Sequence, residues 1–115
     1  DSRRSGNYQF ARAGWCADYN EPSSFLNILK SKNTNNYGRY ASAEFDALMA
    51  KTLVPGTTEE QRADLYQQAE AQADKDMPVI PIYHYVSPRL VKPYVQGLST
   101  DPLDNFYFKD MSFKK

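Results

Sequence analysis

The stretch TTEEQRADLYQQAEAQADKDMPVIPIYHYV, residues 57–86, decides the fold class of this chain. It opens with a capping box, in which Thr57 caps a helix and Glu60 stands three residues later. Apolar residues at helical spacing continue the helix as far as the following proline. Residues 79–86 are β-branched and aromatic and predict a strand, at an edge or a bulge because Pro81 removes one ladder hydrogen bond. A long helix followed directly by a strand indicates an α/β chain.

Similar local signals predict the other elements, which do not alternate strictly between strand and helix and together give an α/β or an α+β fold with a mixed sheet flanked by helices. They are a strand over residues 8–13, a short helix from Pro22 with Phe25, Leu26 and Leu29 on its apolar face, a loop over 31–40, a helix capped by Ser42 with Phe45, Leu48, Met49 and Leu53 facing inward, a strand over 90–95, a turn over 101–104 and an extended segment over 106–113. In the long helix, the inward positions are Leu65, Tyr66, Ala69 and Ala73.

Composition limits the classes of partner. The 115 residues suffice for one small domain, and Lys+Arg and Asp+Glu balance at 14 each. A balanced charge argues against nucleic acid as a partner and against an electrostatic membrane anchor. Because the sequence opens at Asp1 with neither an initiator Met nor a signal peptide, we expect a piece of something longer.

Residues 12–22, RAGWCADYNEP, form the best candidate for a binding site. Asp18 lies among aromatic residues, where a carboxylate favours a cation such as a ligand ammonium; the alternative is an aspartate that caps the following turn. Arg12 and Arg3 could hold a ligand carboxylate in bidentate fashion. The alternative for both arginines is a surface position or an internal ion pair.

Aromatic and nucleophilic residues supply the remaining candidates. Trp15 is either a pocket wall or a core residue. The period of two in a strand places Tyr83 and Tyr85 on one face, for ligand contact or sheet packing, and His84 on the other. The single Cys16 is expected by composition to be a buried free thiol that behaves as a small hydrophobe. Cys16 and His84 are also a conceivable hydrolytic pair, but no nucleophile elbow accompanies them. No metal site, phosphate loop or cofactor is expected.

Several stretches resemble, in the same order, the C-terminal part of the bacterial periplasmic oligopeptide-binding proteins, the solute-binding subunits (family 5) of ABC importers. They are RAGWCADYNEP (12–22), SFLN (24–27), FD (45–46), RADLY (62–66), VIPIY (79–83), RLVKPY (89–94) and DPLDN (101–105). The resemblance implies a periplasmic protein of two lobes with the type II periplasmic-binding fold, about four to five times longer than this chain. Residues 1–95 would belong to the second lobe and residues 96–115 would return toward the first.

The resemblance also implies roles for the candidate residues. Asp18 takes the ammonium of a peptide of about two to five residues, held by its termini and backbone. Arg12 and Arg3 neutralise the peptide carboxylate, although Arg4 could replace Arg3. Trp15 lines a side-chain pocket, Tyr85 contacts the ligand, and Cys16 is half of a disulfide whose partner lies outside this chain. The implied partners are short peptides, a membrane permease and the remainder of the same polypeptide.

Three alternatives stay open from the sequence. A murein-tripeptide-binding relative shares the same fold. A small hydrolase would use Cys16 and His84, and an independent adaptor domain would need no further polypeptide.

Overall fold

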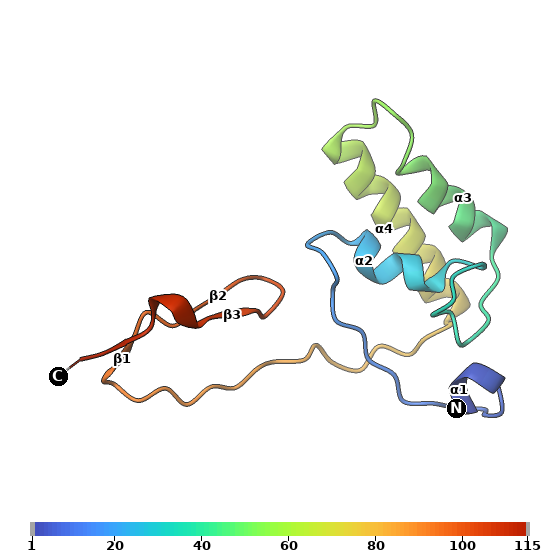
Figure 1. Ribbon diagram of the computed structural model, residues 1–115. Helices are drawn as coiled ribbons and strands as arrows, with labels where there is room; N and C mark the ends of the chain where they lie inside the picture. Colours follow the sequence, from blue (N-terminus) through green and yellow to red (C-terminus); the bar gives the residue numbers. More distant parts are fainter. Residues whose placement is uncertain (1, 115) are drawn as a thin grey trace.

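The computed structural model describes residues 2–114. Most helices lie in the first two thirds of the chain and all strands in the last fifth (Figure 1). The elements are α1 (Ser2–Ser5), α2 (Ser23–Leu26) with a 3-10 turn (Asn27–Leu29), α3 (Ala43–Lys51), α4 (Glu59–Asp76), β1 (Val95–Gln96), β2 (Ser99–Thr100), β3 (Phe106–Tyr107), a second 3-10 turn (Phe108–Asp110) and β4 (Ser112–Phe113). No helix in the described range is long and apolar enough to span a membrane.

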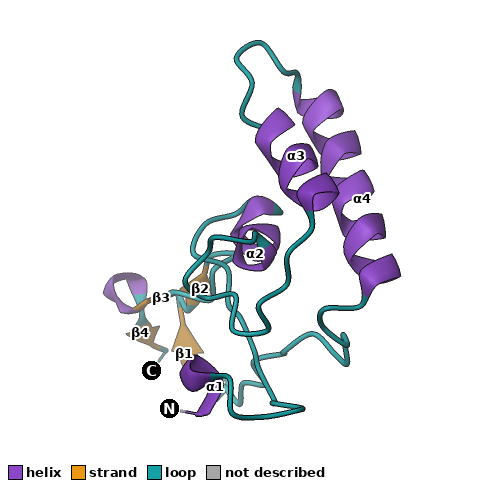
Figure 2. Cartoon of the chain, turned by 90° about the vertical axis from the view of Figure 1, so that its right-hand side faces the viewer, coloured by secondary structure: helices purple, strands orange, loops and turns teal. Residues whose placement is uncertain are grey.

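The core lies between α3 and α4, which run side by side in both views (Figures 1 and 2). Phe45 is fully buried and its ring meets the Tyr40 ring edge-on, with 5.6 Å between centroids. The other buried apolar residues are Met49, Tyr66, Ala69 and Ala73, with Leu26, Leu29, Tyr40 and Leu48 packed around them. Small alanines on α4 let the bulky residues of α3 approach closely, as dense packing requires.

Helix α3 begins at its predicted cap, and the cap of α4 lies one residue after the predicted one. Ser42 accepts a hydrogen bond from the backbone N–H of Phe45, as expected from the sequence. The capping box of α4 uses Thr58 and Gln61, however, and not Thr57 and Glu60. Two adjacent threonines followed by Glu, Glu and Gln satisfy the motif in either register. The hydroxyl of Thr57 instead donates to the carbonyl of Val54.

Two predicted core positions are wrong. Leu53 is 73% exposed because α3 ends at Lys51 and the chain turns away before Leu53 can face α4. Phe25 is 48% exposed, whereas its neighbour Leu26 packs against the core. The short α2 therefore buries Ser23 and Ser24 and packs Leu26 against the core, but it leaves Phe25 in solvent.

The last fifth of the chain folds as two small antiparallel sheets. β1 pairs with β4, placing Val95 opposite Phe113, and β2 pairs with β3, placing Thr100 opposite Phe106. The turn between β2 and β3 is held by Asp101, whose carboxylate accepts hydrogen bonds from the backbone N–H of Asn105 (3.0 Å) and from its side chain (2.9 Å). The predicted turn at 101–104 is therefore confirmed.

The strands predicted over residues 8–13, 79–86 and most of 90–95 do not form in the described part of the chain. Residues 79–86 are extended and exposed, with no backbone hydrogen bond to any described residue. A strand needs a neighbour to complete its ladder, and none lies alongside. The mixed sheet is likewise absent within residues 2–114, where only the two antiparallel pairs occur.

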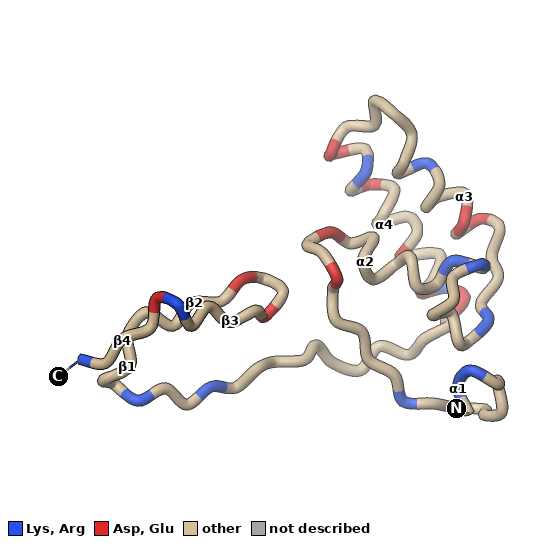
Figure 3. The backbone as a smooth tube through the Cα atoms, in the orientation of Figure 1, with Lys and Arg blue, Asp and Glu red and all other residues tan. Residues whose placement is uncertain are grey.

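The molecule is elongated. Its radius of gyration is 18.7 Å, whereas a compact domain of this length would have roughly 13 Å. A long unpaired trace joins the helical part to the small sheets (Figure 1), and positive and negative residues are interspersed over both parts (Figure 3). A chain of this shape leaves much apolar surface uncovered.

Candidate functional site

The loop that carries the candidate residues is tied to α4 through Glu21. The Tyr66 hydroxyl donates to Oε1 of this carboxylate at 2.8 Å and the Ser23 hydroxyl to Oε2 at 3.1 Å. The Arg62 guanidinium lies 3.6 Å from the same Oε1. Three donors on one carboxylate fix the end of the loop against the helical core. This anchor is not among the residues predicted from the sequence, although an acid directly before the helix-starting Pro22 is a visible signal.

Asp18 is fixed by its backbone and free at its side chain. Its N–H donates to the hydroxyl of Ser24 at 2.8 Å, and Ser24 is only 4% exposed. The carboxylate is exposed and has no hydrogen-bond or ion-pair partner among the described residues. It does not cap the following turn, so the structure does not support that alternative. A carboxylate held in place without a partner can accept a cationic group.

Arg12 lies against Tyr83 and Tyr85, more than seventy residues away in the sequence. Its Nη2 donates to the Tyr83 hydroxyl at 3.1 Å and also to the Tyr85 hydroxyl. The two tyrosine rings meet edge-on, with centroids 5.0 Å apart. The prediction that both tyrosines share one face is therefore confirmed. Gly14 completes the contact, because a Cβ there would lie 3.2 Å from Cε2 of Tyr85.

The hydrogen bonds among Arg12, Tyr83 and Tyr85 shift the pKa values of all three side chains. The hydrogen bond to Tyr83 raises the pKa of Arg12, which stays positively charged. The pKa of the Tyr83 phenol is lowered, first by the hydrogen bond with Tyr85 and then by that from Arg12. The pKa of the Tyr85 phenol is raised, chiefly by its hydrogen bond with Tyr83. The cluster therefore presents a cation and two hydroxyls at neutral pH.

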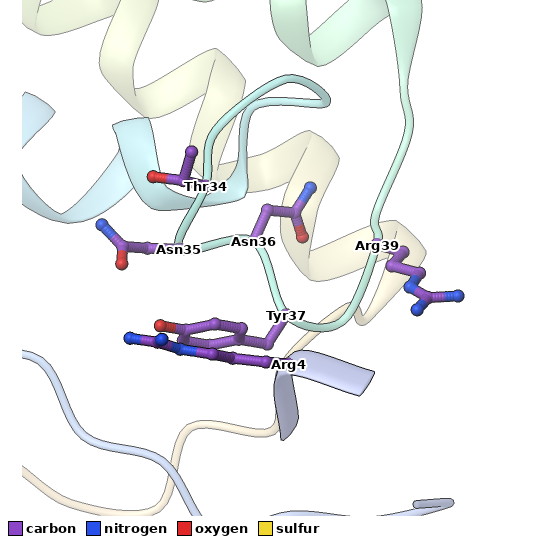
Figure 4. A pocket seen from close by; sticks show the side chains of 6 residues that line it. All are labelled: Arg4, Thr34, Asn35, Asn36, Tyr37 and Arg39. Carbon is purple, nitrogen blue, oxygen red and sulfur yellow. The ribbon is translucent and has the colours of Figure 1, made fainter. Parts of the chain in front are cut away.

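Arg3 and Arg4 lie elsewhere, on α1 against the loop that contains Tyr37. The Arg3 guanidinium lies over the Tyr37 ring, 5.2 Å from its centroid. Arg4 borders an open hollow of about 320 Å³, where its side chain runs parallel to the Tyr37 ring (Figure 4). The other lining residues are Thr34, Asn35, Asn36 and Arg39. Arg3 thus stacks on this loop, whereas Arg12 contacts the tyrosines.

Trp15 and Cys16 differ in exposure. Trp15 is half-buried, and its indole Nε1 is shielded from solvent without an acceptor among the described residues. A shielded N–H without a partner is costly. Cys16 is an exposed free thiol, so the expectation of a buried thiol is wrong. No hydrogen bond within residues 2–114 joins it to the exposed His84, and no metal-binding group of three or more His, Cys, Asp or Glu occurs there.

The chain is similar to a part of several longer periplasmic binding proteins among the curated proteins. No model of a known protein family matches it. It is 52% identical over 112 residues to the periplasmic oligopeptide-binding protein OppA of Salmonella typhimurium, covering 96% of this chain and 20% of that protein. Two Escherichia coli proteins match all or nearly all of the chain and 21% of their own length: the "Probable deoxycholate-binding periplasmic protein YgiS" (41% identical) and the periplasmic murein peptide-binding protein MppA (37% identical).

A solved structure gives the same result in three dimensions. The crystal structure of Haemophilus influenzae OppA in complex with RPPGFSPFR matches 99% of this chain with a TM-score of 0.84 and 46% identity. The matching region makes up 22% of that chain. The chain therefore spans about a fifth of the length of the proteins it matches. The expected type II periplasmic-binding fold is confirmed, because the solved proteins that the chain matches have this fold.

Proposed function

Because this chain belongs, as a segment of about one fifth of their length, to the family of periplasmic oligopeptide-binding proteins, we propose that it forms one wall of a peptide-binding cleft in an ABC-type import system. The observation that carries the proposal is Asp18, a residue positioned by buried Ser24 whose carboxylate has no partner within residues 2–114. A binder of many peptides must recognise what all peptides share, which is their termini and backbone. An unpaired carboxylate at the cleft meets the first of these needs.

Asp18 would accept the α-ammonium of the peptide. A hydrogen bond to a charged group contributes about 1.5–3 kcal/mol, and the backbone hydrogen bond from Asp18 to Ser24 holds the side chain ready for it. The half-buried indole of Trp15 would line a pocket for a peptide side chain.

Arg12 would neutralise the peptide carboxylate, with Arg3 contributing for other peptide lengths. A guanidinium has five N–H donors, and the tyrosine hydroxyls occupy only Nη2 of Arg12. The Nε and Nη1 groups remain for a carboxylate, while Tyr83 and Tyr85 hold the cation and contact the ligand. In the relative solved with RPPGFSPFR the bound peptide has nine residues, so in that protein the ligand exceeds the expected two to five.

The remaining assignments concern the whole protein. Residues 1–95 would belong to the second lobe and residues 96–115 would return toward the first. The exposed Cys16 would form a disulfide with a residue outside this chain. The full protein would lie in the periplasm, as the names of its relatives state of them, and would deliver peptide to a membrane permease. The relatives are binding proteins, which favours binding over hydrolysis by Cys16 and His84.

The relatives differ in their named ligands, so the test must separate peptides from other solutes. We expect Asp18→Asn in the full-length protein to weaken binding of trialanine at least ~10-fold, about 1.4 kcal/mol, by calorimetry. N-acetyl-trialanine lacks the ammonium, so it should bind wild type and variant equally weakly. Deoxycholate also lacks an ammonium, so the substitution should not weaken its binding.

Two controls make the result specific. Asp74→Asn changes an exposed carboxylate on α4 and should leave the affinity for trialanine unchanged. If Asp18→Asn binds trialanine as tightly as wild type does, the ammonium assignment is wrong. If only a murein peptide binds wild type, the specificity is that of the murein-peptide relative.

A further inference from the structure

The extended trace between the helical part and β1 (Figure 1) makes two sets of side-chain contacts, one directly after the other. Tyr83 and Tyr85 contact Arg12. Ser87 and Arg89 follow and contact the turn between β2 and β3. Side chains alternate between the two sides of an extended backbone, so these four odd-numbered residues share one side of it. No turn or bend interrupts the trace there, and the second set of contacts therefore bears on the first.

The acceptor in the β2–β3 turn is Asp104, whose backbone lies in the left-handed region with a φ of 64°. Residues other than glycine are uncommon in this region, although Asp and Asn tolerate it. The Asp104 carboxylate accepts hydrogen bonds from the Ser87 hydroxyl and from the Arg89 guanidinium, with which it forms an ion pair. The Asp101 carboxylate is used within the turn and by the adjacent strand. Asp104 therefore serves to join the hairpin to the extended trace.

Arg89 makes two further contacts with the same hairpin. Its guanidinium carbon lies 4.4 Å from the centroid of the Phe106 ring, and its Nη1 donates to the hydroxyl of Thr100 at 3.4 Å. The side chains of Arg89 and Asp104 are 31% and 48% exposed, and a single ion pair of this exposure contributes little to stability. Several contacts that converge on one guanidinium do restrict where it lies. The main effect of the arrangement is thus on geometry.

Pro88 makes the connection between the two sets of contacts stiff. Its ring fixes its own φ and keeps the preceding Ser87 in extended backbone. Ser87 is separated from Tyr85 only by Val86, a span of about 7 Å in an extended chain. The position of Ser87 therefore limits where the Tyr85 ring can lie.

We propose that Arg89 and Asp104 are positioning residues for the candidate site. Their ion pair, which we call the Arg89–Asp104 clasp, holds the extended trace on the hairpin so that its two tyrosines keep the Arg12 guanidinium in place. The two residues act through the tyrosines and not on the ligand. This inference rests on the proposed function, in which Arg12 receives the peptide carboxylate.

Titration of the tyrosines by NMR tests the clasp in the peptide-free, full-length protein with ¹³C at tyrosine Cζ. The pKa of Tyr83 is lowered and that of Tyr85 is raised by the hydrogen bonds that the two hydroxyls share with each other and with Arg12. We expect Asp104→Asn to reduce the difference between the two midpoints to less than half of its wild-type size. Asn tolerates the left-handed backbone as Asp does, so the variant removes the charge and keeps the turn. Unchanged midpoints would overturn the proposal.

A matched control and a second variant complete the titration. Asp110→Asn removes an exposed carboxylate from the second 3-10 turn, one that has no hydrogen bond or ion pair within residues 2–114. This variant should titrate as wild type does, and an effect as large as that of Asp104→Asn would overturn the proposal. If Asp104→Asn does not fold, Arg89→Gln serves with the same readout and the same expectation.

Calorimetry with trialanine and trialanine amide tests the consequence for binding, because the amide lacks the terminal carboxylate. We expect wild type to prefer the free acid and Asp104→Asn to reduce this preference at least ~3-fold, since a loosely held Arg12 must be immobilised on binding. Equal weakening of both peptides would show a purely structural role and overturn the positioning. If wild type binds both peptides equally, the proposed role of Arg12 is wrong. The titration needs no peptide, and it then still decides whether the clasp positions the tyrosines.

Discussion

The contact between Tyr66 and Glu21 offers the sharpest test of how the site loop is held. Tyr66 is 7% exposed and its hydroxyl donates to the Glu21 carboxylate at 2.8 Å. Hydrogen bonds to charged groups contribute about 1.5–3 kcal/mol. The carboxylate also keeps Ser23 and the partly exposed Arg62 as partners, so removal of the phenol does not leave it orphaned. We therefore expect a coupling at or just below the low end of this range, about 1–1.5 kcal/mol.

A double-mutant cycle measures this coupling. Tyr66→Phe, Glu21→Gln and the double variant would be compared by native-state hydrogen exchange at the α4 amides of the full-length protein, which gives the free energy of local opening. The matched control pairs Tyr66→Phe with Asp64→Asn. Within the described residues, the Asp64 carboxylate accepts a hydrogen bond from Gln68 and none from Tyr66. The control pair should be additive within about 0.5 kcal/mol. If the Tyr66–Glu21 pair is equally additive, the loop is not anchored through this contact.

Two further predictions concern stability. Phe45→Ala removes the fully buried ring that meets Tyr40 edge-on, and should lower the free energy of unfolding by about 3–5 kcal/mol in urea unfolding; a loss below about 1 kcal/mol would contradict its central place in the core. Hydrogen bonds from Asn105 lower the pKa of Asp101 in the folded hairpin. The carboxylate therefore stabilises the turn fully above the ordinary carboxyl pKa of about 3.9, and this stabilisation is lost as the pH falls through the lower folded value. In an NMR titration the β2–β3 amides should shift with a midpoint below that of an unstructured aspartate, and a midpoint at or above it would refute the assignment.

The helices were predictable because their signals are local. Ser42 caps α3, and a threonine with an acid or amide three residues on caps α4. The register error at Thr58 arises because the neighbouring threonine satisfies the same pattern. Leu53 was misplaced because helical periodicity does not state where a helix ends.

The strands were not predictable in their pairing, because pairing is not local. Residues 79–86 have the β-branched and aromatic composition of a strand, but no strand forms there, because a ladder requires a partner that residues 2–114 do not supply. The candidate site shows the same division. Period two gave the shared face of Tyr83 and Tyr85, but nothing in the sequence placed Arg12 against them.

Arg12 already occupies a fixed position in the peptide-free molecule, because two hydroxyls hold one of its nitrogens. A free arginine side chain gives up about 1.5–2 kcal/mol of rotamer entropy when it is immobilised. In the proposed role of Arg12 as the group that receives the peptide carboxylate, the two tyrosines restrict this motion beforehand, so that less of the entropic cost falls on binding. A site of this kind can be indifferent to side chains and still bind tightly, because its charged groups need little rearrangement for each new ligand.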